Sequence, residues 1–204
     1  MVEEQLRRRG IKDERVLAAM LEIPRQEFVP VELRVLSYQD DPIDIGCGQT
    51  ISQPYMTALM AQSLELRGTE TILDVGTGSG YGAAVLGALG ARVISIELVP
   101  NLAEWASRNL ERTGRAGNVQ VITGDGSVGY PQAAPYDAIT VGAAAPEVPA
   151  ALVDQLRVSS RLVIPVGTRQ DQSLMIITRK RVGKKTRVGT QCRFVPLRGA
   201  EGWR

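Results

Sequence analysis

From residue 70 onwards, the chain alternates short apolar runs with segments whose apolar positions recur at helical spacing. The runs predict strands at 70–76, 92–97, 118–125, 137–143 and 161–167, and the segments between them predict helices at 81–89, 101–113 and 149–156. Strands that alternate with helices form a parallel sheet covered on both faces. Two further runs, 173–180 and 191–197, are expected to close the sheet. The sequence therefore predicts an α/β fold with a doubly wound, mostly parallel, Rossmann-like sheet.

Before residue 70, the pattern is helical in two places. In residues 13–23 the apolar positions share one face, and Asp13 is a suitable N-cap. A second helix is expected to begin at Pro54, because proline suits the first helical position. Its inward positions are Leu59, Met60 and Leu64. Prolines and glycines punctuate residues 24–50, which predicts loop and short turns there.

Composition and charge narrow the classes of function. The chain has 24 basic and 22 acidic residues, a balance that gives no reason to expect a nucleic acid or an anionic membrane as partner. No apolar run approaches the roughly 18 residues of a spanning helix, and the N-terminus has no signal-peptide pattern. Two cysteines and no histidine give neither a disulfide framework nor an expected metal site. We therefore expect a cytoplasmic protein, and a monomer.

The charge is concentrated in one place. Six basic residues lie between Arg179 and Arg187, separating the two closing strands. Such a run is usually a solvated hairpin. Contact with a substrate backbone is the alternative.

Three glycines mark a ligand loop. Gly76, Gly78 and Gly80 follow a predicted strand and open a helix, and Glu97 ends the next strand, at the spacing typical of an acidic residue that binds ribose hydroxyls. The spacing is G-x-G-x-G rather than the dinucleotide pattern, and the bulky Tyr81 does not suit a pyrophosphate at the helix terminus. A ligand with ribose but no phosphate fits better. S-adenosylmethionine is one, and Asp74 would lie near its cationic end.

Residue patterns alone leave the roles of two other segments undecided. Asp125 and Gly126 end a third strand, so Asp125 either accepts a hydrogen bond from an adenine amino group or forms an ordinary turn. The polar stretch "GCGQTISQPYM", residues 46–56, contains no standard catalytic group. Its Ser52 precedes the helix at Pro54 and either caps that helix or orients an anion at its N-terminus.

Several blocks of the sequence together resemble the protein-L-isoaspartate O-methyltransferase family over nearly the whole chain. They are "IPRQEFVP" (23–30), "GQTISQPYMTALM" (48–60), "LDVGTGSGYGAAVL" (73–86), "GDG" (124–126), "PYDAITVGAAAPEVPAALVDQL" (135–156), "RLVIPVG" (161–167) and "FVPL" (194–197). The resemblance implies methyl transfer from S-adenosylmethionine, with S-adenosylhomocysteine as product, to the abnormal carboxylate of L-isoaspartyl residues. The methyl ester then closes to a succinimide, which can reopen as normal aspartate.

The resemblance also implies a set of site residues. Ser52 is the expected active-site residue, with Thr50, Ile51 and Gln53 as substrate contacts. The expected cofactor contacts are Asp74, Gly76, Thr77, Gly78, Gly80, Glu97, Leu98, Asp125 and Gly126. The chain would form one methyltransferase domain, with N-terminal helices and a substrate loop in residues 1–68 and the cofactor-binding core in residues 69–204.

The sequence departs from the family pattern at a few positions. Asp44 adds a negative charge near a site meant for a carboxylate, which bears on peptide affinity. Gln26 replaces a frequent histidine. Ser159 and Ser160 stand where the family has two glycines before a late strand.

The absence of histidine fits this chemistry. A carboxylate nucleophile, with an ordinary pKa of about 3.9, is already ionised near neutrality and needs no general base. Alignment of the reacting groups is then the main requirement. The competing hypotheses are a methyltransferase for a small molecule or RNA, an NAD-dependent oxidoreductase, and a non-enzymatic adaptor that retains the fold.

Overall fold

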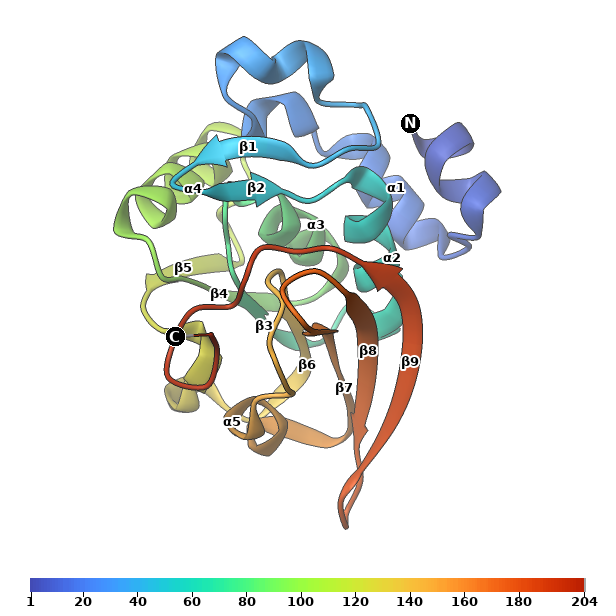
Figure 1. Ribbon diagram of the computed structural model, residues 1–204. Coiled ribbons are helices and arrows are strands. Elements are labelled where there is room, and N and C mark those ends of the chain that lie inside the picture. The colour runs from blue at the N-terminus through green and yellow to red at the C-terminus, as the bar shows by residue number, and fades with distance from the viewer. Residues whose placement is uncertain (204) are drawn as a thin grey trace.

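The computed structural model describes residues 1–203, and a seven-stranded sheet forms its centre (Figure 1). The strands lie in the order β5-β4-β3-β6-β7-β8-β9. Their bounds are β3 Thr71–Val75, β4 Arg92–Glu97, β5 Val119–Thr123, β6 Tyr136–Val141, β7 Leu156–Gly167, β8 Gln172–Arg179 and β9 Lys184–Cys192. The first five of these strands pair in parallel, whereas β7, β8 and β9 pair antiparallel. The predicted α/β class and mostly parallel sheet are confirmed.

Helices cover both faces of this sheet. On one face, α2 (Pro54–Leu64), α3 (Tyr81–Leu89) and α4 (Pro100–Arg112) pack on strand residues such as Ile72 and Val93. On the other face, α5 (Ala150–Asp154) packs on a second cluster that includes Leu73 and Ile94. Because neighbouring residues of a strand point to opposite faces and both faces are covered, the buried strands are largely apolar, with Asp74, Ser95 and Glu97 as buried exceptions. This burial on both faces explains why the apolar runs located these strands.

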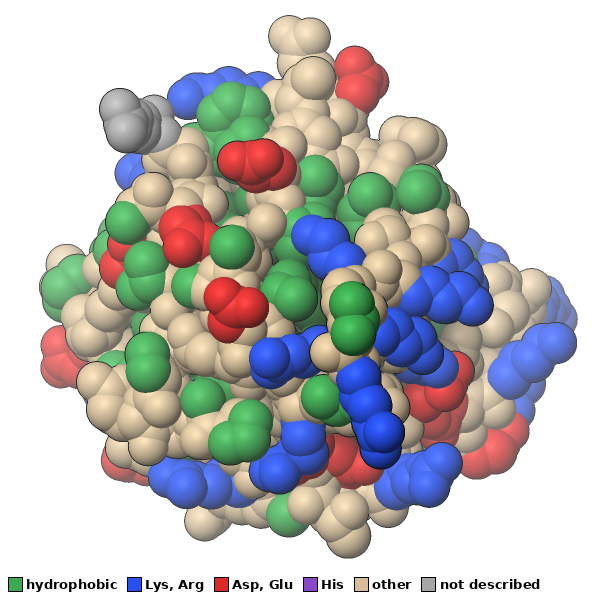
Figure 2. Space-filling view, turned by 90° about the horizontal axis from the view of Figure 1, so that it is seen from below, with side chains coloured by type: hydrophobic (Ala, Val, Ile, Leu, Met, Phe, Trp, Pro, Cys, Tyr) green, Lys and Arg blue, Asp and Glu red, His purple; other side chains and the backbone are tan. Residues whose placement is uncertain are grey.

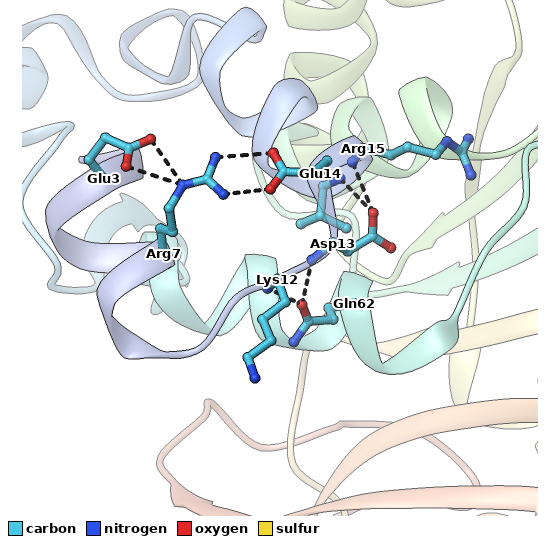
Figure 3. A network of polar contacts seen from close by, with 8 residues as sticks. Glu3, Arg7, Lys12, Asp13, Glu14, Arg15 and Gln62 are labelled. Carbon is cyan, nitrogen blue, oxygen red and sulfur yellow. Dashed lines mark hydrogen bonds and ion pairs between the residues drawn. The ribbon is translucent and has the colours of Figure 1, made fainter.

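Polar contacts fasten the segment before residue 14 to α2 (Figure 3). As predicted, Asp13 caps α1 (Glu14–Glu22) by accepting from the amides of Arg15 and Val16. Gln62 of α2 accepts from the Lys12 and Asp13 amides at 2.6 and 2.9 Å through its Oε1. Residues before and after α1 form short helical turns, at Val2–Leu6, Arg7–Arg9, Arg25–Phe28 and Val31–Leu36.

Two sequence-based predictions of local structure are wrong. Residues 24–50 are not simply loop, since β1 (Ile43–Gly46) pairs antiparallel with β2 (Gln49–Ile51) in a small separate hairpin. The last strand begins at Lys184 rather than near residue 191, and residues 193–197 leave the sheet. An edge strand keeps charged side chains in solvent, so β9 lacks the apolar signature that located the buried strands.

The basic run occupies the β8–β9 hairpin. The turn is closed by the Lys180 amide, which donates to the carbonyl of Gly183 at 3.0 Å, and residues 180–190 are exposed. Arg179, at the start of the run, is half-buried and donates to the Asp154 carbonyl at 2.8 Å. Figure 2 looks at the end of the molecule to which this hairpin points, and Lys and Arg side chains crowd one half of that face. This is the solvated hairpin that the charge run predicts. Within residues 1–203, no helix is both long and apolar enough to cross a bilayer.

Candidate active site

The glycine loop after β3 forms a tight turn beside β4. Gly76, Gly78 and Gly80 have φ angles of 89°, 56° and 90°, in the left-handed region that favours glycine. The amides of Gly76 and Thr77 donate to the carbonyl of Ile96 at 2.8 and 3.2 Å, which ties the loop to β4. The loop thus lies at the carboxyl ends of the parallel strands, where ligands bind in open α/β sheets.

Three clefts meet at this end of the sheet, and we name each by one residue. The Asp74 cleft is lined by Asp74, Thr77, Ser79, Tyr81, Thr57 and Ser52 among others. The Glu97 cleft is lined by Glu97, Leu98, Gly126 and residues 195–198. The Phe194 cleft is lined by Pro42, Ser52, Gln53 and residues 191–195. Thr50 and Gly142 line all three. The clefts therefore open onto one another at the tip of β2 and the end of β6.

Asp74 lies on the floor of its cleft with 5% of its surface exposed. Ser95 Oγ donates to Asp74 Oδ2 at 2.7 Å, and Thr77 Oγ1 lies 2.6 Å from Ser95 Oγ. Because Ser95 has a single hydroxyl hydrogen, Thr77 is the donor in the second bond. Burial raises the pKa of Asp74 to about 7, the bond from Ser95 opposes this rise, and the charge of Glu97 adds to it. In residues 1–203 no basic side chain forms an ion pair with this carboxylate, so the cleft offers a buried acid without a cation.

Glu97 holds the glycine loop as well as lining a cleft. Its Oε2 accepts from the Gly78 amide at 2.9 Å, and its Oε1 accepts from the Val99 amide at 3.0 Å. Each carboxylate oxygen has a second lone pair, so capacity to accept from a ligand hydroxyl remains. Leu98 beside it keeps 41% of its surface exposed, which gives the cleft an apolar wall.

Asp125 is placed differently from the other candidates. Its Oδ1 accepts from the amide of Ser127 at 2.9 Å, and its Oδ2 accepts from the amide of Ala200 at 2.8 Å. Although partial burial alone would raise the pKa of Asp125, a hydrogen bond from the Ser127 hydroxyl at 2.7 Å and the two bonds from backbone amides lower it below the usual range. Asp125 is not among the residues that line the three clefts, whereas its neighbour Gly126 is. The carboxylate thus fastens the C-terminal segment, and its contact with an adenine stays a prediction.

Gly80 also lies outside the three clefts. A Cβ atom placed on Gly80 would come within 3.2 Å of the Ala106 carbonyl oxygen. This glycine therefore permits close packing of the loop on α4 rather than a ligand contact.

Ser52 lies between the Asp74 and Phe194 clefts, next to Thr50 and Ile51. The helix-cap hypothesis for Ser52 is wrong, because the N-cap position of α2 is Gln53 and no side chain of that position caps the helix. Instead Asp40 Oδ1 accepts from the Tyr55 amide at 2.9 Å. One free amide at this terminus is therefore already taken by a carboxylate, which weakens the expected attraction of an anion by the helix itself. Asp44 is exposed, and its Oδ1 accepts a hydrogen bond from the Gly46 amide at 2.7 Å.

Sequence reasoning missed part of the site. Gly142, which lines all three clefts, is the last residue but one of the predicted strand 137–143 and directly follows the observed β6, so the strand-end rule already contained a signal for it. Residues 194–198 reach the clefts only because the C-terminal segment crosses back over β6, where the Ala144 amide donates to the Val195 carbonyl at 2.8 Å. No local pattern encodes that contact.

Comparison with known proteins decides the family. The family model described as Protein-L-isoaspartate(D-aspartate) O-methyltransferase (PCMT) matches residues 1–202. The chain belongs to the protein-L-isoaspartate O-methyltransferase family. A relative with that name from Methanoculleus marisnigri is 53% identical over 100% of this chain and 92% of its own. Protein-L-isoaspartate O-methyltransferase 2 of Marinobacter nauticus is 55% identical over 100% of this chain and 93% of its own.

Solved structures agree with this family. A putative protein-L-isoaspartate O-methyltransferase from Plasmodium falciparum, in complex with S-adenosyl-L-homocysteine, has a TM-score of 0.80 and 31% identity, covering 97% of this chain and 96% of its own. Another protein-L-isoaspartate O-methyltransferase gives a TM-score of 0.86 at 32% identity, covering 99% of this chain and 67% of its own. The resemblance seen in the sequence blocks is confirmed.

Proposed function

We propose that this enzyme transfers a methyl group from S-adenosylmethionine to the free carboxylate of L-isoaspartyl residues in damaged proteins and peptides. The observation that carries the proposal is the meeting of three clefts at Thr50 and Gly142. Two clefts hold the acidic residues and glycine loop suited to the cofactor. The third leads from Gln53 and Phe194 to Ser52, so a peptide entering it reaches the methyl donor.

The residues of the two cofactor clefts fit S-adenosylmethionine. Glu97 has acceptor capacity for ribose hydroxyls, and Leu98 offers an apolar surface for an adenine ring. Asp74 is a buried carboxylate without a cationic partner, and it suits the positively charged end of the molecule. When bound, S-adenosylmethionine supplies an electrophilic methyl group on a cationic sulfur. The relative from Plasmodium falciparum that binds S-adenosyl-L-homocysteine supports this choice of cofactor.

The work left to the protein is alignment. A carboxylate nucleophile is ionised at neutral pH, so the enzyme need not remove a proton. Attack by an anion on a cationic donor reduces charge, so new charge does not have to be stabilised either. Holding the reacting groups in line accounts for roughly 7–11 kcal/mol in favourable cases. Ser52, between the two clefts, donates a hydrogen bond to the substrate carboxylate and holds it in that line, with Thr50, Ile51 and Gln53 forming the neighbouring wall.

We expect one methyltransferase domain, with the N-terminal helices and the substrate loop in residues 1–68 and the cofactor-binding core in residues 69–204. The two parts share the clefts, since Thr50 and Thr57 line the Asp74 cleft and residues 191–195 line the Phe194 cleft. We also expect the enzyme to act in the cytoplasm, because its two distant cysteines form no disulfide framework, and as a monomer, because the sequence of this small chain gives no exposed apolar stripe.

A pair of peptides tests the proposal. One carries a single isoaspartyl residue, and its twin carries normal aspartate in the same sequence. We expect methylation of the first peptide only, followed by loss of methanol as the succinimide forms, both visible by mass spectrometry. Equal inactivity on the two peptides, with S-adenosylmethionine still bound, would favour a methyltransferase for a small molecule or RNA.

A further inference from the structure

Among residues 1–203, Arg25 is the largest fully buried side chain, with 0% of its surface exposed. Its guanidinium makes no ion pair with any carboxylate in residues 1–203, and its Nη1 atom is buried without a hydrogen-bond partner. A buried charge that lacks a counterion is costly, and such groups are rare unless the site uses them. Burial lowers the pKa of Arg25 to about 10, so the side chain remains a cation at neutral pH.

The hydrogen bonds of Arg25 link the turn at Ser37 to the loop that carries Ser52. Its Nη2 donates to the backbone carbonyl of Ser52 at 2.8 Å, and its Nε donates to the carbonyl of Ser37 at 2.7 Å. The rigid fork of the guanidinium therefore fixes the spacing between the turn that ends at Ser37 and the loop that carries Ser52. Rotation of the Ser52 peptide would redirect its hydroxyl and would break one of these bonds.

Arg25 also touches the cofactor side of the site. Its guanidinium carbon lies 4.9 Å from the ring centroid of Tyr81, a buried residue that begins α3 directly after the glycine loop and lines the Asp74 cleft. Phe28 packs edge-on against the same ring, with the centroids 5.6 Å apart. Arg25 thus joins the loop of Ser52 to the first turn after the cofactor loop through one side chain.

We infer that Arg25 is a positioning residue, which orients the Ser52 loop against the cofactor cleft and gives that loop a positive charge that favours an anionic substrate. The inference rests on the proposed function, since it assigns Arg25 a part in binding the isoaspartyl carboxylate. Asp40, the nearest acid in this region, already serves the Tyr55 amide and Arg9, so it does not cancel the guanidinium directly. The guanidinium therefore places a buried positive charge without an ion-pair partner directly against the backbone of Ser52.

Two substitutions separate the charge from the geometry. Arg25→Lys keeps a cation but cannot donate to both carbonyls as a fork, whereas Arg25→Gln removes the charge. For Arg25→Lys we expect KM for the isoaspartyl peptide within about threefold of wild type and kcat about tenfold lower. For Arg25→Gln we expect KM to rise about tenfold as well. The affinity for S-adenosylhomocysteine should change less than about threefold in both, because Arg25 does not line either of the two cofactor clefts.

A neutral peptide analogue and a control variant exclude a merely structural effect. In the analogue, a carboxamide replaces the free carboxylate, and its inhibition constant is compared with KM for the isoaspartyl peptide. The ratio of this inhibition constant to KM measures the preference for the anion, and it should fall about tenfold in Arg25→Gln but not in Arg25→Lys. The control variant Arg34→Gln removes a nearby arginine paired with Glu27 and should keep the wild-type ratio.

Three outcomes overturn the inference. The first is wild-type kcat and KM in both Arg25 variants. The second is that kcat, KM and cofactor affinity in the Arg25 variants change in proportion to the loss of stability, in the same way as in Arg34→Gln. If Arg25→Gln fails to fold, Arg25→Lys with wild-type kcat suffices to reject the positioning role. Inactivity of the wild-type enzyme on every isoaspartyl peptide would instead reject the proposed function, and this inference with it.

Discussion

Ser95 donates a hydrogen bond to Asp74 across the floor of the Asp74 cleft, with 2.7 Å between Oγ and Oδ2. Burial raises the pKa of Asp74 to about 7, well above its ordinary value. The native state therefore holds a proton that the unfolded state releases between about pH 4 and about pH 7. Over that window the contribution of Asp74 to the free energy of unfolding falls as pH rises, by about 4 kcal/mol at most.

Replacing Asp74 with asparagine removes this titration while keeping an oxygen for Ser95. We expect the stability of Asp74→Asn, measured by urea denaturation, to fall less between pH 5 and pH 8 than that of the wild type. Equal slopes in the two proteins would show that Asp74 titrates normally in the fold.

Glu97 supports the glycine loop and, on the proposed function, the ribose. In the wild type, the backbone amides of Gly78 and Val99 each donate to one oxygen of Glu97. Glu97→Gln replaces one of these oxygens with an NH2 group, which cannot accept, so one backbone amide loses its acceptor. Hydrogen bonds to charged groups contribute about 1.5–3 kcal/mol, so we expect S-adenosylhomocysteine to bind about 10 to 100 times more weakly by calorimetry. Glu104→Gln, on the exposed side of α4, is the matched control and should bind normally.

Ser52→Ala tests the orienting hydroxyl. Losing a hydrogen bond to the substrate carboxylate should lower kcat for an isoaspartyl peptide about 10 to 100 times, and the affinity for S-adenosylhomocysteine should stay near that of the wild type. Ser107→Ala, whose hydroxyl bonds only within α4, is expected to keep full activity. Methylation by Ser52→Ala at the wild-type rate would remove Ser52 from the mechanism.

Ser159 occupies a position where the family has glycine, and its φ angle of 71° lies in the left-handed region. A non-glycine residue there costs about 1–2 kcal/mol, although glycine also makes the unfolded chain more flexible. We expect Ser159→Gly to raise the free energy of unfolding by about 0.5–1 kcal/mol. Ser160→Gly, in ordinary strand conformation, should lower it instead, so the same sign for both substitutions would refute the strain.

Gly199 lets the C-terminal segment cross over Asp125. A Cβ atom at Gly199 would lie 2.0 Å from Asp125 Oδ1 and 2.4 Å from Ser127 Oγ, so the segment must shift in Gly199→Ala. Because Leu197 and Arg198 line the Glu97 cleft, we expect cofactor affinity to fall about tenfold by calorimetry. Gly117→Ala, where the added atom meets nothing within 4 Å, should leave it unchanged.

The sequence predicted the parts of the molecule that local patterns encode. Buried parallel strands such as Thr71–Val75 are mostly apolar, with Asp74 as the buried exception, and the residues that follow this strand line the clefts. Both the sheet and its ligand edge were therefore predictable. The missed features depend on partners far along the chain. Arg25 meets Ser52, 27 positions later, and Asp125 meets Ala200, 75 positions later. No periodicity or turn signal encodes such contacts. For Arg25 the sequence is also misleading, because arginine side chains are usually exposed.

The exposed edge of β9 has a consequence for how copies of this enzyme meet one another. Its outer backbone groups have no strand partner in the sheet, and such an edge invites pairing with an identical strand. Lys184, Lys185 and Arg187 lie along it, so two copies that paired there would bring like charges together. Repulsion between these like charges opposes pairing of two β9 edges, which is one way for a sheet to end at an exposed strand.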